Sequence, residues 1–376
     1  FIGRSRFIPV HGTNGTRCVM RKAGIDVQWV RFEMKFKKPA KTSRGTLLTK
    51  PSWLIRLRDV TGACGWGECS IIPGLSMDEP AEIEAHLLDI QQRREVVFEE
   101  VPLALPALRF AIEMALADLK TRQSFVPFDG SFAQGQSRIE INGLIWMDDP
   151  KGLLDQAATL LKSGFKTLKA KVGSMPFEQE LEWMRALRTI APEVTFRVDA
   201  NGAFSQPESG WTPLKKLESL AEIGLHSIEQ PLHPSDKRGL AELCTVSPVP
   251  IALDESLIGV PVEAQGALLD AIDPDFLVLK PSLLGGFAAS QHWIQQAEQR
   301  DMGWWVTSAL ETNMGLNAIA QWTANGIQSD APLLPQGLGT GGLFTNNIPA
   351  PLEVSEGYLS ARGVQNWEAP EVRSVS

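Results

Sequence analysis

Five charged residues follow one another at the spacing of strand–helix units. Three of them are acidic, Asp199, Glu229 and Asp254, and Lys171 and Lys280 flank them at successive separations of 28, 30, 25 and 26 residues. Each charge ends a short apolar run rich in Val, Ile, Leu or Phe, as expected at the end of a buried strand. In a (β/α)₈ barrel the C-terminal ends of the strands share one rim, where catalytic residues gather. The five side chains are therefore predicted to converge on one small volume.

The three acids offer only hard oxygen ligands, which suits Mg²⁺ or Mn²⁺ and disfavours zinc. An acid after a strand can instead cap the next helix, a role that Asp favours, and for a single acid this alternative would prevail. Three successive strand ends with lysines on both sides favour a metal site formed by Asp199, Glu229 and Asp254.

Two lysines share one strand face. Lys169 and Lys171 in TLKAKVG stand two residues apart, so their side chains point the same way. Repulsion between two ammonium groups beside a metal predicts that the pKa of one lysine falls, towards use as a base. A solvated basic edge is the alternative, but the segment is otherwise apolar. Lys280, which follows FLVL, would lie nearly across the barrel from Lys171 and act on the opposite side of a bound substrate.

Together these residues can remove a proton from the carbon next to a carboxylate. That proton is weakly acidic, so the negative charge must be stabilised where it develops, and a divalent ion does this well. A base that faces a metal-bound carboxylate meets both requirements. The sequence thus predicts metal-assisted abstraction of an α-proton.

The elements that must position these residues fall into two blocks. Residues 26–70 alternate apolar and polar side chains as strands do, and residues 79–97 and 106–122 carry apolar residues at helical spacing. They indicate an α+β unit. From Ile139 seven strand–helix pairs follow, with a possible eighth strand near PQGLG at 335–339, which is typical of parallel βαβ units.

The predicted fold class is therefore α/β, a (β/α) barrel with an N-terminal α+β capping domain. An open doubly wound sheet is the alternative, but it gathers ligands at one switch point and not at five successive strand ends. The predicted division is a leader or disordered segment at 1–25, a capping domain at 26–135, a barrel at 136–345, and a C-terminal segment at 346–376 that packs back on the first domain.

Bulk properties narrow the class of protein. A length of 376 residues fits a barrel plus an accessory domain, and the net charge of −8 argues against nucleic acid as a partner. There is no apolar run of about 18 residues, which disfavours a membrane-spanning helix. The four cysteines lack CxxC spacing, so reduced thiols in a cytoplasmic enzyme are expected. Organised alternation begins near Val27, and residues 1–19 are predicted to have no catalytic role.

Weaker signals suggest substrate contacts. Residues 337–342 match GxGxxG, but the helix required for a dinucleotide site does not follow. The loops that contain Gly285 and Gly339 could still offer backbone N–H groups to a carboxylate. Ser308 and Glu311, at the seventh strand end, and Asn201, just beyond Asp199, are further candidates. The five histidines are interpreted as structural.

With these residues the chain resembles the muconate-lactonising subgroup of the enolase superfamily, in which a Lys or His base works with Mg²⁺. It resembles more narrowly the o-succinylbenzoate synthase family, over about residues 26–360. The lysines and acids described above are typical of the subgroup. The segments INGLIWM, SALE and GLGTG carry the narrower assignment.

The resemblance implies that Lys171 removes the α-proton and then assists departure of hydroxide in a syn elimination. It implies that Lys280 stabilises the intermediate as a cation, that Lys169 tunes Lys171 and touches the carboxylate, and that the three acids bind Mg²⁺. The implied substrate is a small dicarboxylate, 2-succinyl-6-hydroxy-2,4-cyclohexadiene-1-carboxylate, dehydrated to 2-succinylbenzoate in menaquinone biosynthesis. Arg44, in a capping loop near residues 42–47, would contact the tail carboxylate, or be simply an exposed loop arginine.

Two other enzyme activities use the same scaffold and remain as alternatives for this chain. N-succinylamino-acid racemases and dipeptide epimerases use the same two lysines and metal. Racemising relatives often carry Arg three residues after the second catalytic lysine, where this chain has Leu283, which leans against racemisation. A non-catalytic barrel that binds an acidic metabolite would leave the convergent charges unexplained. Residues 1–25 match nothing expected of the family.

Overall fold

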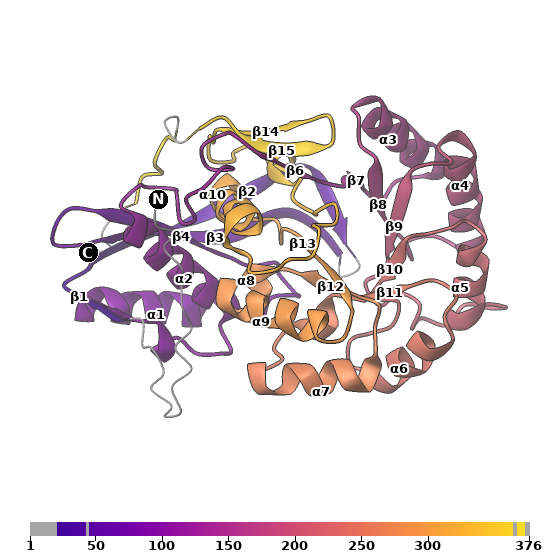
Figure 1. The fold of residues 1–376 in the computed structure, drawn as a ribbon, viewed down its shortest axis with the longest axis horizontal. Helices are drawn as coiled ribbons and strands as arrows, with labels where there is room; N and C mark the ends of the chain where they lie inside the picture. Colours follow the sequence, from indigo (N-terminus) through magenta and orange to yellow (C-terminus); the bar gives the residue numbers. More distant parts are fainter. Residues whose placement is uncertain (1–20, 43–44, 364–366, 373–376) are drawn as a thin grey trace.

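The computed structural model describes residues 21–42, 45–363 and 367–372 of the chain. An antiparallel sheet with two long helices lies beside a curled parallel sheet ringed by helices (Figure 1). The first part comprises β1 (Arg21–Ala23), β2 (Asp26–Thr42), β3 (Gly45–Arg58), β4 (Cys64–Ser70), α1 (Pro80–Arg93), β5 (Glu95–Val97), the 3₁₀ turn η1 (Phe98–Glu100) and α2 (Pro106–Thr121).

The second part alternates strands and helices. Its elements are β7 (Gly143–Ile145), α3 (Pro150–Lys162), β8 (Thr167–Lys171), α4 (Phe177–Ile190), β9 (Thr195–Asp199), α5 (Pro213–Ala221), β10 (Ser227–Glu229), α6 (Lys237–Val246), β11 (Ile251–Leu253), the turn η2 (Glu255–Leu257), α7 (Val262–Ile272), β12 (Phe276–Leu279), α8 (Pro281–Leu284), α9 (Phe287–Glu298), β13 (Gly303–Val306), α10 (Asn313–Gln321) and the π-helical turn η3 (Trp322–Gly326).

These seven parallel strands pair in sequence order from β7 to β13. Gln336 forms a parallel bridge to Ile141 next to β7, and Gly337 forms one to Thr307 next to β13. This short segment therefore joins the two edges of the sheet. The predicted barrel is confirmed, and the eighth strand predicted at 335–339 is reduced to two bridging residues.

The C-terminal residues pack against both parts. Strands β14 (Leu352–Ser355) and β15 (Tyr358–Ala361) form an antiparallel sheet with β6 (Arg138–Glu140), after the turn η4 (Gly341–Leu343). Phe344 bridges to Phe36 of β2, and the Trp367 ring stacks on Phe125 with 4.6 Å between centroids. The polypeptide after the barrel thus returns to the capping sheet.

Two segments differ from the sequence-based expectation. Arg21–Ala23 pair with β5, and Ile25 is buried, so these residues belong to the capping domain and not to the leader predicted at 1–25. Residues 1–20 lie outside the described part. The helix predicted at 79–97 ends at Arg93, because Arg94 takes a left-handed conformation (φ 53°) and the chain continues into β5.

Two glycines let helix α2 lie directly on strand β4. A Cβ atom at Gly65 would stand 2.1 Å from the Ala115 carbonyl oxygen, and one at Gly67 would stand 2.1 Å from the Ala111 carbonyl oxygen. Strand β3 of the same sheet buries Trp53 in the core of the capping domain. Glycine at 65 and 67 is therefore required for the close packing of the helix on the sheet.

Replacing Gly67 with alanine should lower the free energy of unfolding by about 1–3 kcal/mol, because backbone must move to admit the methyl group. Urea denaturation measures the change. Gly342→Ala is the matched control, since no atom lies within 4 Å of its Cβ position. Equal stability of the two variants would contradict the packing argument.

Asp118 of α2 anchors two segments of the capping domain. Its carboxylate accepts hydrogen bonds from the backbone N–H groups of Trp66 (2.9 Å) and Val126 (2.7 Å). Burial raises the pKa of Asp118 to about 7. The native state therefore holds this proton more tightly than the unfolded chain, so the contribution of Asp118 to stability is lost as the pH rises from about 4 to about 7.

Asp118→Asn should remove this pH dependence. Between pH 5 and 7 the free energy of unfolding of the parent protein should fall, relative to the variant, by up to about 1.4 kcal/mol per pH unit. Urea denaturation at pH 5, 6, 7 and 8 measures the difference. A constant difference across this range would show that Asp118 does not titrate there.

Glutamates of the capping domain cap two barrel helices. Glu68 of β4 accepts hydrogen bonds from the Thr312 and Gly315 N–H groups at the start of α10, at 2.8 and 2.9 Å. Glu113 of α2 accepts from the Phe287 and Ala288 N–H groups at the start of α9, at 2.6 and 3.0 Å. Negative charge at a helix N-terminus is favourable, so both contacts hold the capping domain on the barrel.

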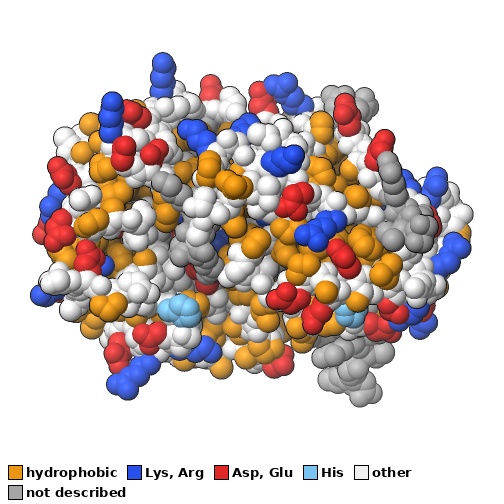
Figure 2. All heavy atoms as spheres, turned by 180° about the vertical axis from the view of Figure 1, so that it is seen from behind, with side chains coloured by type: hydrophobic (Ala, Val, Ile, Leu, Met, Phe, Trp, Pro, Cys, Tyr) orange, Lys and Arg blue, Asp and Glu red, His pale blue; other side chains and the backbone are white. Residues whose placement is uncertain are grey.

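The surface carries mixed charge. On the face seen in Figure 2, acidic and basic side chains lie among apolar ones. Within the described ranges, no helix combines the length and the apolar content needed to cross a membrane. Cys64, Cys69 and Cys244 are free thiols.

Candidate active site

The three predicted ligand residues meet at the C-terminal rim of the barrel. Asp199 ends β9, Glu229 ends β10 in register with it, and Asp254 follows β11. One carboxylate oxygen from each residue lies within 4.8 Å of those from the other two, and all three residues are buried. Parallel pairing of successive strands explains the convergence, since equal register places their last residues side by side.

Lysines surround this acidic cluster. The Lys169 ammonium group contacts Asp199 at 3.1 Å and donates a hydrogen bond to Glu229. The Lys171 ammonium group lies 3.4 Å from the Asp199 carboxylate, and that of Lys280 pairs with Asp254. Each buried charge therefore has a partner of opposite sign.

The charges shift one another's pKa values. Burial disfavours the charged form of Lys169, but Asp199, Glu229 and Asp254 outweigh burial and raise its pKa. The pKa of Lys280 is raised in the same way, chiefly by Asp254. The sequence predicts a lowered pKa for one of the two lysines, and Lys169 is not that lysine, because the acids on neighbouring strands raise its pKa.

Burial and the two neighbouring acids raise the pKa of Glu229 to about 7 despite Lys169. The pKa of Asp199 is lowered, because three lysines outweigh the effect of burial. Glu229 Oε1 is buried and has no hydrogen-bond partner among the described residues. A buried carboxylate oxygen without a donor, beside two further carboxylates, fits a hard divalent cation such as Mg²⁺.

Asn201 links the base to a second acid. Its backbone has a positive φ of 43°, which Asn tolerates better than most residues. Its Oδ1 accepts from the Lys171 ammonium group at 2.5 Å, and its Nδ2 donates to Glu255 Oε1 at 2.9 Å. Asn201 therefore holds the Lys171 side chain over the acidic cluster.

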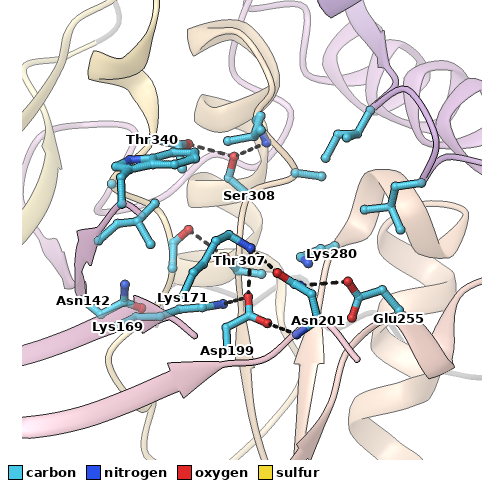
Figure 3. A pocket seen from close by; sticks show the side chains of 18 of the residues that line it. Asn142, Lys169, Lys171, Asp199, Asn201, Glu255, Lys280, Thr307, Ser308 and Thr340 are labelled. Atoms are coloured by element: carbon cyan, nitrogen blue, oxygen red, sulfur yellow. Dashed lines mark hydrogen bonds and ion pairs between the residues drawn. The ribbon is translucent and has the colours of Figure 1, made fainter. Parts of the chain in front are cut away.

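A cavity opens above these residues (Figure 3). Its apolar lining includes Ile72 and Leu75 of the capping domain, with Trp146 and Leu310 of the barrel. The Leu310 backbone is strained, with φ of 65°. The capping domain thus completes the cavity that the barrel rim begins.

A chain of hydroxyl groups also reaches the cavity. Thr340 Oγ1 donates to Ser308 Oγ at 2.8 Å, and Ser308 Oγ donates to Glu311 Oε2 at 2.7 Å. Ser282 Oγ donates to the other oxygen of Glu311 at 2.5 Å. The buried Glu311 carboxylate, whose pKa burial raises, therefore orients the serine and threonine that face the cavity.

The structure brings most of the predicted substrate-contacting residues to the cavity. Asn201, Ser308 and Gly339 line it, and Glu311 lies directly behind Ser308. Gly285 does not reach it, because the short helix α8 separates Gly285 from the strand end and places it in another depression. Arg44 lies outside the described residues.

Several cavity residues were not predicted individually from the sequence, although some lie in the segments INGLIWM, SALE and GLGTG. They are Asn142, Leu144, Trp146, Glu255, Thr307, Leu310 and Thr340, together with Ile72, Pro73 and Leu75 of the capping domain. Glu255 directly follows Asp254, and the 3₁₀ turn η2 redirects it towards Asn201. Asn142 precedes a predicted strand, and Thr307 follows one. Their positions next to these strands could therefore have been used to find them.

Comparison with known proteins gives the family. The profile described as "Enolase C-terminal domain-like" matches residues 152–363. The chain is 41% identical to the o-succinylbenzoate synthase of Desulfotalea psychrophila over a match that covers 90% of this chain and 99% of that protein.

Solved structures agree. The crystal structure of MenC from Desulfotalea psychrophila has a TM-score of 0.77 and 39% identity and covers 90% of this chain and 100% of that chain. The dipeptide epimerase of Enterococcus faecalis, solved with Mg and a dipeptide, has a TM-score of 0.75 and 21% identity, with 91% and 99% covered, and so shares the fold. The chain therefore belongs to the enolase superfamily and, within it, to the family of the o-succinylbenzoate synthases.

Proposed function

We propose that this protein catalyses the dehydration of 2-succinyl-6-hydroxy-2,4-cyclohexadiene-1-carboxylate to 2-succinylbenzoate, a step of menaquinone biosynthesis. The observation that carries this proposal is the cavity in which Lys171 and Lys280, from β8 and the end of β12, flank a buried triad of acids. The 41% identity to an o-succinylbenzoate synthase supports the choice of substrate.

We propose that Asp199, Glu229 and Asp254 hold Mg²⁺. When bound there, the ion would neutralise charge that develops on the substrate carboxylate. Lys169, which contacts both Asp199 and Glu229, fixes the orientation of these two acids.

Lys171 acts on the ring. In our proposal its neutral amine takes the proton from C1, the C1–C6 double bond forms as the C6–oxygen bond breaks, and the resulting ammonium group gives the proton to the departing hydroxide. One lysine on one face thus serves as base and then as acid, which explains a syn elimination. Lys280, on the other side, provides a positive charge to the developing anion.

The cavity suits a substrate with an apolar ring and polar arms. Trp146, Leu144 and Ile72 offer a surface for the cyclohexadiene ring, and the hydroxyl groups of Ser308 and Thr340 lie beyond it. We propose that the succinyl arm extends along this hydroxyl wall. The two lysines and the metal then remain at the carboxylate end of the ring.

A direct assay tests the proposal. In the presence of Mg²⁺, the purified protein should convert the cyclohexadiene substrate to 2-succinylbenzoate. The absorbance change on aromatisation measures the rate. Turnover should stop when EDTA removes the metal and return when Mg²⁺ is added. Absence of turnover, together with α-proton exchange on N-succinyl amino acids, would transfer the assignment to a racemase.

The racemase and epimerase alternatives rest on the shared scaffold. The Enterococcus faecalis epimerase has the same fold at 21% identity, which does not extend to activity. Leu283, three residues after Lys280, is buried and apolar in α8 and supplies no charge to a substrate. The dehydration is therefore the better-supported activity.

A further inference from the structure

The side-chain amide of Asn201 lies between the proposed base and an acid that has no part in the proposed reaction. The Lys171 ammonium group donates to Asn201 Oδ1 at 2.5 Å, and Asn201 Nδ2 donates to Glu255 Oε1 at 2.9 Å. Figure 3 shows the three side chains next to one another at the cavity, which all three line. Glu255 is therefore connected to the base through a single amide group.

The backbone on both sides of this amide is held in place by Gln230, which is fully buried. Gln230 Oε1 accepts hydrogen bonds from the backbone N–H groups of the residues before and after Glu255, at 3.2 and 3.1 Å. The Gln230 carbonyl group accepts from the N–H group of Gly202, which directly follows Asn201, at 2.7 Å. With both loops fixed, the main freedom left to Asn201 is a rotation of its amide by half a turn.

The two orientations of the amide have opposite effects on the base. A neutral lysine amine has two N–H groups and one lone pair. When the N–H groups point to Asn201 Oδ1 and to Asp199 Oδ2, which lies 3.4 Å from Lys171 Nζ, the lone pair takes the remaining direction and is free. If Nδ2 faced Lys171 instead, the amide would donate to that lone pair and occupy it. The base can thus take a proton only while Oδ1 faces it.

We infer that Glu255 is a positioning residue that keeps the Asn201 amide turned with Oδ1 towards Lys171, and so keeps the lone pair of Lys171 available for the α-proton. A carboxylate oxygen can only accept a hydrogen bond, so the amide must direct Nδ2 at Glu255. Its other end, Oδ1, then faces the lysine. This inference rests on the proposed function.

The role does not depend on the protonation of Glu255. Burial and Asp254 raise the pKa of Glu255, and Lys280 and Lys171 oppose this rise. A protonated carboxyl group still has an acceptor oxygen, so the hydrogen bond from Asn201 Nδ2 is possible in both states. A glutamine at the same position differs, because its amide can offer Asn201 either an oxygen or an N–H group.

Glu255→Gln should therefore allow the blocking orientation of Asn201. With saturating Mg²⁺ and saturating cyclohexadiene substrate, kcat of this variant should fall about tenfold or more. The affinity for 2-succinylbenzoate, measured by calorimetry with Mg²⁺ present, should stay close to that of the parent protein, because product binding needs no free lone pair. Product binding also shows that the variant is folded. An unchanged kcat would overturn the inference.

A double-mutant cycle with Asn201→Gly separates positioning from the loss of a negative charge. Glycine suits the positive φ of 43° at residue 201 and removes the amide. In the Asn201→Gly background, Glu255→Gln should lower kcat by no more than about twofold, because no amide remains to turn. The same factor in both backgrounds would show that Glu255 acts through its charge, and would overturn the inference. Asn201→Ala takes the place of the glycine variant if that variant does not bind the product.

Failure of the proposed function would have a different signature. If the parent protein does not dehydrate the cyclohexadiene substrate, that function fails, and the same cycle is then measured on α-proton exchange of N-succinyl amino acids in D₂O, in which Lys171 would remove the proton as well. The loss on Glu255→Gln should again depend on Asn201. A parent protein with neither activity would overturn both the function and the inference.

Discussion

Lys171→Met should reduce turnover of the cyclohexadiene substrate by about a thousandfold or more. General acid–base catalysis by one side chain contributes typically about 10²–10⁴ in rate, and here one lysine is proposed to remove one proton and return it. Methionine keeps an unbranched stem like that of lysine and lacks the terminal nitrogen. The loss should appear in kcat, measured by the absorbance change on aromatisation.

The affinity of the variant for 2-succinylbenzoate should stay close to that of the parent protein, because the product needs no base. Lys166→Met is the matched control. Lys166 is exposed just before the other end of the same strand, β8, and so tests the same substitution away from the cavity. A Lys171→Met protein that keeps more than about a tenth of the parent rate could not be using Lys171 as its base.

Lys171→Arg adds a second measurement. Arginine keeps a positive charge near Asp199, but its guanidinium group stays protonated in proteins and cannot accept the α-proton. Activity should therefore be lost in both variants. If the arginine variant alone were active, the role of residue 171 would be electrostatic and not that of a base.

The charged centre could be predicted from sequence because its geometry follows from a repeat. Lys171, Asp199 and Glu229 end three neighbouring parallel strands, and the ladder places Lys171 opposite Asp199 and Glu229 opposite Asp199. Once strand–helix alternation is recognised, spacing along the chain becomes proximity in space. Charged residues at the ends of apolar runs can be recognised in a single sequence without any alignment.

The walls of the cavity lacked such a signal. Trp146 and Leu144 resemble ordinary core residues, because an apolar side chain at a strand end reads the same whether it faces a ligand or a helix. Asn142 is a single amide between two short strands. Its place at the cavity depends on the bridge between Ile141 and Gln336, which belongs to the packed structure and not to the sequence.

Two other features could not be read from the sequence, for physical reasons. Gly285 was predicted at the site because it follows Lys280 closely, but one helical turn carries the chain away from the rim. The sequence also left open which of the two lysines of β8 has the lowered pKa, because Asp199 and Glu229 on other strands determine the pKa of Lys169. Residues that are close in the sequence can be carried apart by a turn, and contacts between strands can outweigh contacts along one strand.

Glu229→Gln should weaken Mg²⁺ binding by about a hundredfold or more. The substitution keeps the shape of the side chain and removes one of three negative charges from the buried cluster. Even residues outside the ligand shell change metal affinity about 10–100-fold, and a lost carboxylate ligand should cost at least as much. Calorimetry with MgCl₂ and the substrate-free protein measures this effect independently of catalysis.

Thermal unfolding gives a second readout, because a ligand that binds only the folded state stabilises it by about 2.7 kcal/mol at one hundred times its Kd. The Tm of the parent protein should rise with added Mg²⁺, and that of Glu229→Gln should stay nearly constant over the same concentrations. Glu180→Gln is the matched control, since Glu180 is a buried glutamate of α4 that bonds the Gly173 and Ser174 N–H groups. If Glu229→Gln and Glu180→Gln bound Mg²⁺ equally, Glu229 would not be a ligand, and the metal would have to lie elsewhere on the rim.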